Sequence, residues 1–162
     1  PYYYVYGYQG TDIEAAKSTE NYETYGVLYN WPAVMTDEIC PSSWHIPSDG
    51  EWQTMEMSLG MSESEAADTG WRGTDEGYQM KSSSGWNNDG NGSNSSGFNG
   101  LPGGYRFLGG YFYGFGVGGV WWSSSEFDSS CWKRELNNDS YDVDRNIQYR
   151  DYGFSARCVR DD

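Results

Sequence analysis

Reactive side chains are scarce in this sequence of 162 residues, which has one histidine and three cysteines. A catalytic cysteine–histidine pair would need Cys40 or Cys131 beside His45. His45 stands in the stretch W-H-I-P, just before a helix cap, where a structural hydrogen bond is the commoner role of an imidazole. The 24 acidic residues always supply some suggestive pair, but a glycosidase needs two carboxyl groups opposed across a cleft, which a sequence does not reveal. We therefore expect no catalytic residues.

One polar loop has the spacing of a calcium loop. In NNDGNGSNSSGF, residues 87–98, Asn87, Asp89 and Asn91 mimic the start of an EF-hand loop. The first ligand is Asn instead of Asp, and the twelfth position is Phe98 instead of Glu. The favoured interpretation is a turn-rich loop held by its own hydrogen bonds, with Asp89 and Asn91 as the candidate ligands if another type of calcium loop forms. We expect no obligatory cofactor.

The C-terminal third offers a different kind of chemistry. The stretch LNNDSYDVDRNIQYRDYGF, residues 136–154, mixes Asn, Asp, Ser, Tyr, Arg and Gln with few apolar side chains. Tyr and Trp provide rigid contact area at low entropic cost, and Ser, Asn and Asp provide adaptable hydrogen bonds. The alternative is a solvated sheet face without a ligand, but such faces usually favour Lys, Glu and Thr. We therefore expect a ligand-binding face.

The candidate contact residues extend from the Trp121–Trp122 region to Arg150, and framework-like positions such as Arg134, Leu136 and Val143 are interleaved with them. The candidates are Trp122, Glu126, Phe127, Asp128, Ser130, Cys131, Trp132, Lys133, Glu135, Asn137, Asn138, Asp139, Tyr141, Asp142, Asp144, Asn146, Gln148 and Tyr149.

Charge narrows the choice of ligand. The net charge of −14 disfavours nucleic acids and anionic membranes, because both need a basic face. Solubility is the plain interpretation of this charge, and a cation or a neutral polar ligand such as a sugar is the sharper one. No apolar run approaches the length of a transmembrane helix. The chain begins at Pro-Tyr-Tyr-Tyr with no visible signal peptide, which says nothing about its compartment.

The first half of the chain predicts helices. A short helix is expected in residues 11–18, after an extended segment at 1–10, and a β-prone run at 25–35 should end near Pro32. Two capping boxes, Ser48 with Glu51 and Ser62 with Glu65, predict two short helices within residues 48–69. Glycines 60 and 70 are the expected stops.

The second half predicts strands. Helix signals vanish after Trp71, and residues 81–104 form a long polar loop. Aromatic strand pieces follow at 105–125, further strands with polar faces come next, and residues 153–161 should form a last strand with Phe154, Ala156 and Cys158 on one side. With no internal repeat and no linker, the chain is expected to be one α+β domain.

The three cysteines, Cys40, Cys131 and Cys158, leave two alternatives open. One pair plus one odd thiol fits an exported protein, while a reduced cytoplasmic chain with three inert thiols also fits. The absence of a Cys-x-x-Cys motif argues against zinc.

Five motifs in order resemble one known family: YGVLYNWPAVM, CPSSWHIPSDGEW, SGFNGLPGGYR, VWWSSSE and YGFSARCVRD. They look like the Fibrobacter succinogenes major paralogous domain, which is abundant in exported proteins and lipoproteins of Bacteroidetes-type bacteria. The match runs from about Tyr25 to Asp161 and leaves residues 1–24 outside as an N-terminal extension.

The resemblance implies the formylglycine-generating-enzyme branch of the C-type lectin fold: two helices, then a small twisted antiparallel sheet with long loops, and termini close together. It also implies a disulfide between Cys40 and Cys158. The enzymatic branch uses a reactive cysteine pair, and Cys131 has no evident cysteine partner, so that activity is not carried over.

Members of this branch also serve as variable proteins of diversity-generating retroelements, which display mutated residues on a ligand-binding face. We expect an exported, cell-surface or secreted protein that binds a protein or glycan on another cell, a phage or a host surface. A calcium-assisted carbohydrate-binding adhesion module is the alternative. An enzyme of the formylglycine-generating type is the third hypothesis.

Overall fold

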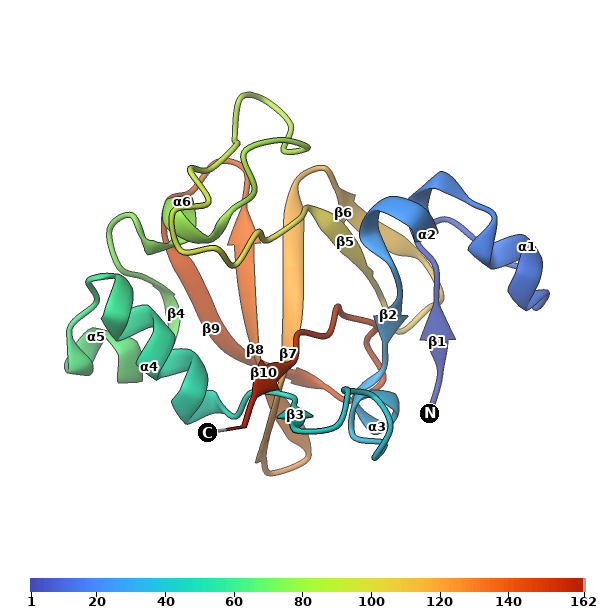
Figure 1. Ribbon diagram of the computed structural model, residues 1–162, viewed down its shortest axis with the longest axis horizontal. Coiled ribbons are helices and arrows are strands. Elements are labelled where there is room, and N and C mark those ends of the chain that lie inside the picture. Colours follow the sequence, from blue (N-terminus) through green and yellow to red (C-terminus); the bar gives the residue numbers. More distant parts are fainter. Residues whose placement is uncertain (162) are drawn as a thin grey trace.

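A twisted six-stranded sheet forms the centre of the computed structural model, which describes residues 1–161 (Figure 1). The helices are α1 (Ile13–Lys17), α2 (Glu20–Tyr25), α3 (Trp31–Val34), α4 (Asp49–Leu59), α5 (Glu63–Ala67) and α6 (Glu76–Met80). The strands are β1 (Tyr3–Tyr4), β2 (Leu28–Tyr29), β3 (Trp44–His45), β4 (Gly70–Arg72), β5 (Gly103–Arg106), β6 (Phe112–Phe115), β7 (Gly118–Phe127), β8 (Ser130–Asn137), β9 (Val143–Tyr149) and β10 (Val159–Arg160).

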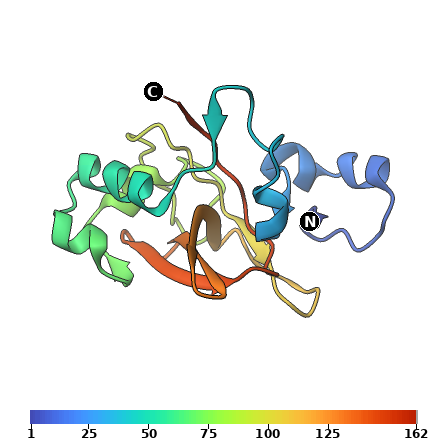
Figure 2. The same cartoon turned by 90° about the horizontal axis from the view of Figure 1, so that it is seen from below.

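The central sheet has the order β4-β9-β8-β7-β5-β6. All neighbours are antiparallel except β5 and β7, which run parallel. Two short pairs, β1 with β2 and β3 with β10, complete the strands. The α+β class is therefore confirmed, although the described chain has more helices than the expected two. The first and last strands, β1 and β10, lie apart in both ribbon views (Figures 1 and 2).

The two predicted capping boxes are confirmed. Ser48 and Ser62 each accept a hydrogen bond from the backbone three residues later, and Glu51 and Glu65 bond back to the cap nitrogens. Each box satisfies backbone donors that the first helical turn leaves unpaired. Helix α4 ends at Gly60 as expected, whereas α5 ends at Asp68 and not at Gly70.

Three local predictions were wrong. Pro32 does not end the preceding run but lies in the first turn of α3, where its missing N–H costs nothing and Asn30 caps the helix. Helix α6 was missed because its N-cap, Asp75, makes no capping bond with its side chain. The last predicted strand shortens to β10 and three isolated bridges, Tyr29 with Phe154, Arg106 with Gly153 and Trp121 with Ser155.

Strand β7 is buried on both faces, because its neighbouring tryptophans point to opposite sides. Trp121 packs with Trp52 and Leu136 in one apolar cluster, and Trp122 packs with Trp31 and Phe154 in the other. This explains the nearly continuous apolar sequence of the strand. The central hairpins are thereby held by packing on two sides.

The disulfide between Cys40 and Cys158 is confirmed. It joins the segment before β3 to the residue before β10 across a sequence separation of 118 residues, beside the pairing of these two strands. Cys131 is the third cysteine, and it is free and buried. Over residues 1–161, no helix has the length and apolar character needed to cross a bilayer.

Candidate ligand-binding face

The pairing of β8 with β9 sorts the candidate residues by face. Lys133 lies opposite Asn146, Glu135 opposite Asp144, and Cys131 opposite Gln148. Residues directly opposite each other in an antiparallel pair point to the same side, and alternate residues share a face. We call the surface formed by Lys133, Glu135, Asp144, Asn146 and Gln148 the outer face.

The intervening residues point inward and attach the sheet to α4. The side chain of Arg134 is fully buried and donates from Nε to Glu56 Oε1 at 2.6 Å and from Nη1 to Asp49 Oδ1 at 2.8 Å. Arg145 donates from Nη2 to Asp49 Oδ2 at 2.7 Å, and Arg72 donates to Glu56 Oε2. These buried ion pairs hold β8 and β9 at a fixed position against the helix.

The pKa values of the two inner carboxylates are shifted in opposite directions. Burial raises the pKa of Glu56 above its usual value, and the charges of Arg134 and Arg72 oppose that rise only in part. Burial also disfavours the charged form of Asp49, but hydrogen bonds and charges from Arg145 and Arg134 outweigh it and hold the Asp49 pKa below its usual value.

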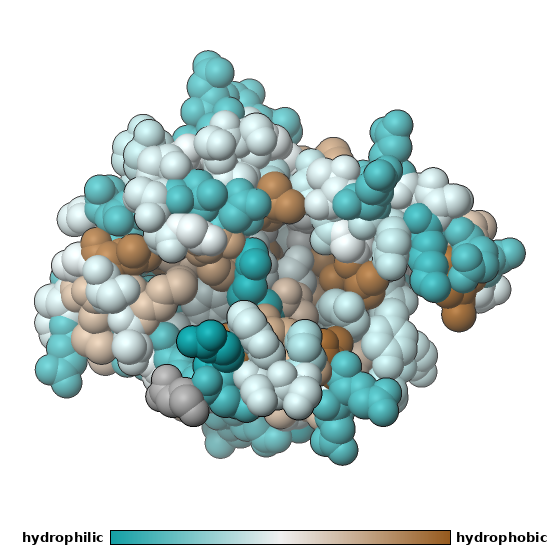
Figure 3. All heavy atoms as spheres, viewed as in Figure 1, coloured by the Kyte–Doolittle hydropathy of each residue, from teal (hydrophilic) through white to brown (hydrophobic). Residues whose placement is uncertain are grey.

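The outer face lies on the side of β8 and β9 away from α4, which contacts the other side through Arg134 and Arg145. By register, Lys133 and Glu135 share a side with Trp122 and Val120 of β7, where α3 and residues 152–154 pack against the sheet. Hydrophilic residues cover most of the side that carries α4, with apolar residues mainly in the hollows between elements (Figure 3).

A small ion cluster occupies the middle of the outer face. Lys133 Nζ donates to Glu135 Oε2 and to Asp144 Oδ2, both at 2.5 Å. The Lys133 and Asp144 side chains are 8% and 7% exposed, while that of Glu135 is 25% exposed. One cation between two carboxylates leaves a net negative charge and free oxygen lone pairs, so Glu135 is the acceptor that a ligand reaches most readily.

Two amides border the cluster. The side-chain oxygens of Asn146 and Gln148 accept hydrogen bonds from the backbone of Ile147 and Tyr149, each at 3.0 Å. This fixes the side chains and leaves their NH₂ groups as donors. The outer face thus combines fixed acceptors and fixed donors.

An aromatic wall of Tyr105, Phe107, Tyr113 and Tyr152 adjoins the cluster on the same side. The ring of Tyr105 lies 6.0 Å from that of Tyr113, and Phe107 lies 5.1 Å from Tyr152. Burial raises the pKa of Tyr105, and the negative charge of Glu135 adds to the rise, which places the phenol beside the ion cluster. Phe107 and Tyr113 remain 39% and 48% exposed and are accessible to a ligand.

The other candidates do not lie on the outer face. At one end of the sheet, the β7–β8 hairpin exposes Glu126, Phe127 and Asp128, with Trp132 and Tyr149 near them. At the other end, Asn137 ends β8, and the β8–β9 connection carries Asn138, Asp139, Tyr141 and Asp142. Strand β8 has 8 residues, so about 23 Å separates the two ends. One continuous contact surface does not include both.

Five candidates are buried. Trp122 and Cys131 have no exposed surface, and Ser130, Lys133 and Asp144 are 8%, 6% and 5% exposed. Glu135, Asn146 and Gln148 are therefore the outer-face residues that a ligand can reach. Burial raises the pKa of the Cys131 thiol to about 11, so it remains protonated at neutral pH. Sequence patterning did not identify the burial of Trp122 and Cys131 because it depends on the packing of α3 and the 150–154 segment.

The polar loop at 87–98 is held by its own hydrogen bonds. The Asn91 side-chain oxygen accepts from the Trp86 backbone at 3.0 Å, and the Asn87 carbonyl accepts from Gly90 and from the Asn138 amide. Asp89 is exposed. Within residues 1–161, no group of three or more His, Cys, Asp or Glu residues could hold a metal ion, and a calcium role for Asp89 and Asn91 stays a prediction.

His45 is held by two carboxylates. Its Nδ1 lies 2.6 Å from Asp161 Oδ1, and its Nε2 lies 2.7 Å from Glu51 Oε1. Hydrogen bonds from the ring to the Asp161 carboxylate, and next to that of Glu51, raise the His45 pKa above its usual value. Both ring nitrogens are thus occupied in tying β10 to the start of α4.

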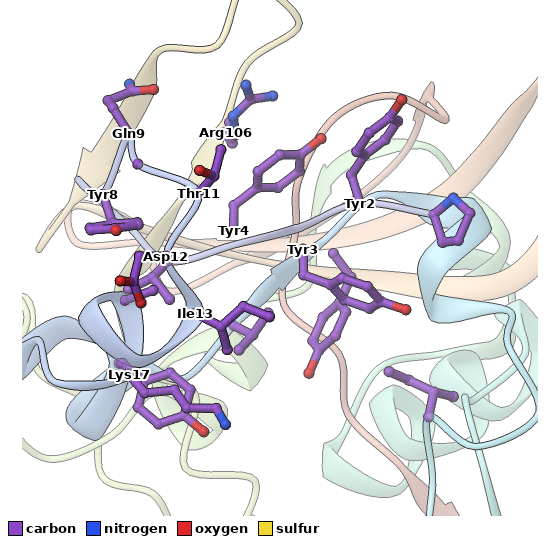
Figure 4. Close-up of a pocket in the computed structure, with 18 of the residues that line it drawn as sticks. Tyr2, Tyr3, Tyr4, Tyr8, Gln9, Thr11, Asp12, Ile13, Lys17 and Arg106 are labelled. Atoms are coloured by element: carbon purple, nitrogen blue, oxygen red, sulfur yellow. The ribbon is translucent and has the colours of Figure 1, made fainter.

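A second site, missed by the sequence analysis, lies in the N-terminal extension. A groove of about 1110 Å³ runs between the β1 segment, α1 and the loop after α3. Tyr2, Tyr3, Tyr4 and Tyr29 are among its lining residues (Figure 4). The tyrosine run at residues 2–4 is the sequence feature that marks this groove. Tyrosine is also common in strands, so the run by itself indicates a strand and not a binding site.

Comparison with known proteins gives one match. No curated protein and no solved structure matches the chain. Residues 4–160 match the Fibrobacter succinogenes major domain. The expected boundary near Tyr25 was wrong, because the match includes residues 4–24. This match shows that the chain belongs to that family.

Proposed function

We propose that this protein is a non-enzymatic binding protein whose outer face, together with the aromatic wall, contacts a protein or glycan ligand. The observation that carries the proposal is the register of β8 and β9, which gathers Glu135, Asn146 and Gln148 around the buried Lys133 and Asp144 on one side and puts the anchors Arg134 and Arg145 on the other. Aromatic rings beside fixed hydrogen-bonding groups are typical of adaptable recognition surfaces.

The division between faces also suits a surface that varies in sequence. Arg134 and Arg145 hold the strands to α4 by buried ion pairs, whereas Asn146 and Gln148 form side-chain hydrogen bonds only to the residues that follow them. Substitution on the outer face therefore leaves the anchors intact. We infer a C-type-lectin-like frame that displays such positions, as in variable proteins of diversity-generating retroelements.

The reactive groups support binding over catalysis. The Cys131 thiol is buried with a pKa of about 11, and both nitrogens of His45 are engaged. A formylglycine-generating enzyme needs a reactive thiol, so that alternative predicts thiol-dependent turnover that disappears in Cys131→Ser.

A disulfide is typical of oxidising compartments, and the Cys40–Cys158 bond therefore supports export. The proposed partner lies on another cell, a phage or a host surface.

A selection experiment tests the proposal. Phage-displayed peptides and a glycan array are screened against the wild-type protein and against the double variant Asn146→Ala/Gln148→Ala. Asn138→Ala/Asp139→Ala, at the far end of β8, is the matched control. We expect enriched ligands that lose binding to the first variant and keep binding to the control. Equal binding to both variants would refute the outer face as the contact surface.

A further inference from the structure

The N-terminal groove is a built feature of the fold. Backbone pairing of β1 with β2 places Tyr3 opposite Tyr29, and Asn30 Oδ1 accepts from the Tyr2 backbone at 2.7 Å. Gln9 donates to the Gly110 carbonyl at 3.0 Å, which ties the extension to the β5–β6 turn. Both ribbon views show α1 projecting from the body beside this segment (Figures 1 and 2). The walls of the groove are therefore held in place without a ligand.

Exposed aromatic rings line the groove. Tyr2 precedes β1 and Tyr4 ends it, and the rings of these alternate residues lie nearly parallel with centroids 6.5 Å apart. Tyr3 points to the other side of the strand and meets the ring of Tyr29 edge to face at 5.7 Å. Tyr2 and Tyr3 are 65% and 58% exposed. Figure 4 shows these rings arranged along β1 around the groove. A soluble domain rarely exposes adjacent rings without a binding role.

The phenol groups make the groove polar as well as aromatic. Burial raises the pKa of Tyr29, and the neighbouring phenols of Tyr22 and Tyr3 add to the rise. Burial also raises the pKa of Tyr4. These hydroxyls remain protonated at neutral pH, and each can donate and accept a hydrogen bond.

The charges at the rim select against two classes of ligand. Three acids, Asp12, Asp37 and Glu38, and two bases, Lys17 and Arg106, line the groove, for a formal balance of −1. A polyanion would meet net repulsion there. A purely apolar ligand would bury these charges and the phenols without partners, which is costly.

The size of the groove indicates an extended ligand. Its volume of about 1110 Å³ reaches the upper end of the ~300–1,000 Å³ typical of small-molecule sites. Sugar rings present C–H faces to aromatic rings and hydroxyls to polar rims, and both features are present here. We propose that the groove is a second binding site, for a neutral oligosaccharide that crosses the unpaired edge of β1. It would contact the ring of Tyr2 on one side and that of Tyr3 on the other, and hydrogen-bond to the surrounding hydroxyls and charged groups.

This site is separate from the outer face. Arg106 lies over the ring of Tyr4 at 4.0 Å on the groove side of β5. Its neighbours in sequence, Tyr105 and Phe107, both reach Tyr113 on the other side. One chain could therefore hold a glycan in the groove while the outer face binds a different partner.

Calorimetry with defined sugars tests the inference. The probes are cellohexaose, xylohexaose and maltohexaose, with a sulfated hexasaccharide as the anionic comparison and an uncharged hexapeptide as the non-sugar comparison. The variants are Tyr2→Ala and Tyr3→Ala, which remove exposed rings. Tyr111→Ala and Tyr149→Ala remove rings that are 64% and 58% exposed outside the groove, and they are matched controls. Asn146→Ala reports on the outer face.

We expect at least one neutral hexasaccharide to bind. Its Kd should rise about tenfold in Tyr2→Ala and in Tyr3→Ala and should not change in the other three variants. The inference is overturned if no neutral hexasaccharide binds, if the sulfated sugar or the peptide binds more tightly, or if only Asn146→Ala weakens binding. If Asn146→Ala weakens binding of the outer-face ligand and leaves the affinity for the hexasaccharide unchanged, the two sites are separate. Because the removed rings are exposed, unchanged melting temperatures are expected and provide the folding control.

Discussion

Arg134 Nε donates a hydrogen bond to Glu56 Oε1 at 2.6 Å, and neither side chain has any exposed surface. This contact joins β8 to α4 on the inner face of the sheet. The residues on either side of Arg134, Lys133 and Glu135, point to the outer face. A single strand thus carries the anchor of the fold and the proposed contact residues in alternation.

Removal of the buried carboxylate should strongly destabilise the fold. Glu56→Ala leaves Arg134 and Arg72 buried without their shared partner, and an unpaired buried charge costs about 3–5 kcal/mol. We expect a melting temperature about 10 °C lower, measured by circular dichroism. Glu63→Ala, on the exposed side of α5, is the control and should change little. Equal melting temperatures for the two variants would contradict the anchoring role.

Tolerance to substitution should follow the faces of the strands. In a library displayed on yeast and selected for protease resistance, Asn146 and Gln148 should accept most residues. Leu136, Val143 and Arg145, which are buried, should accept few because replacements leave cavities or unpaired charges. Deep sequencing before and after selection gives the tolerance at each position. If the tolerance to substitution did not depend on the face that a residue occupies, the division into a buried face and an exposed binding face would be contradicted.

The two kinds of cysteine should behave differently. Loss of the Cys40–Cys158 bond in a Cys40→Ser/Cys158→Ser variant should reduce the free energy of unfolding by on the order of 4 kcal/mol, because the bond closes a long loop. Urea titration measures this change.

Cys131 should resist iodoacetamide at pH 8 while the protein is folded, because its thiol is buried and its pKa is about 11. Alkylation followed by mass spectrometry checks this, and the same reaction in guanidinium chloride is the positive control. Rapid alkylation of Cys131 in the native protein would contradict its burial and would support a thiol-dependent activity.

The pH dependence of stability should reveal His45. Its two carboxylate partners raise the folded pKa above the usual value, so the protonated imidazole stabilises the folded state. This contribution is complete below the unfolded pKa, near ~6.5, and disappears as the pH rises through the folded pKa. His45→Gln should therefore reduce the melting temperature at pH 5.5, and the difference from wild type should vanish at alkaline pH. Proton NMR of the one histidine in the chain gives its pKa directly, and a value at or below ~6.5 would contradict the bridging geometry.

Local sequence signals predicted the parts of the fold that depend on neighbouring residues. The capping boxes at Ser48 and Ser62 were reliable because both partners lie within one helical turn. The family resemblance, and not spacing, indicated the disulfide. Helix α6 and the burial of Cys131 depend on contacts with distant segments, which one sequence without pairing information does not specify.

The candidate face was predicted as a segment and not as a surface. The alternation of inward and outward residues along β8 can be predicted from the sequence. The register of β8 against β9 cannot, and it determines which residues share a side with the aromatic wall. Packing of α3 and residues 152–154 buries Trp122 and Cys131, and the length of β8 separates the two ends of the segment. The groove at Tyr2 and Tyr3 was hidden for the same reason, since its walls come from distant parts of the chain.

The most direct test of the outer face is an NMR titration of the ¹⁵N-labelled protein with a peptide or glycan enriched in the screen. The side-chain NH₂ signals of Asn146 and Gln148 report contact without any mutation. We predict that both signals shift in proportion to ligand occupancy, while that of Asn88, in the distant polar loop, does not move. Saturating ligand that leaves the Asn146 and Gln148 signals unchanged would contradict the account.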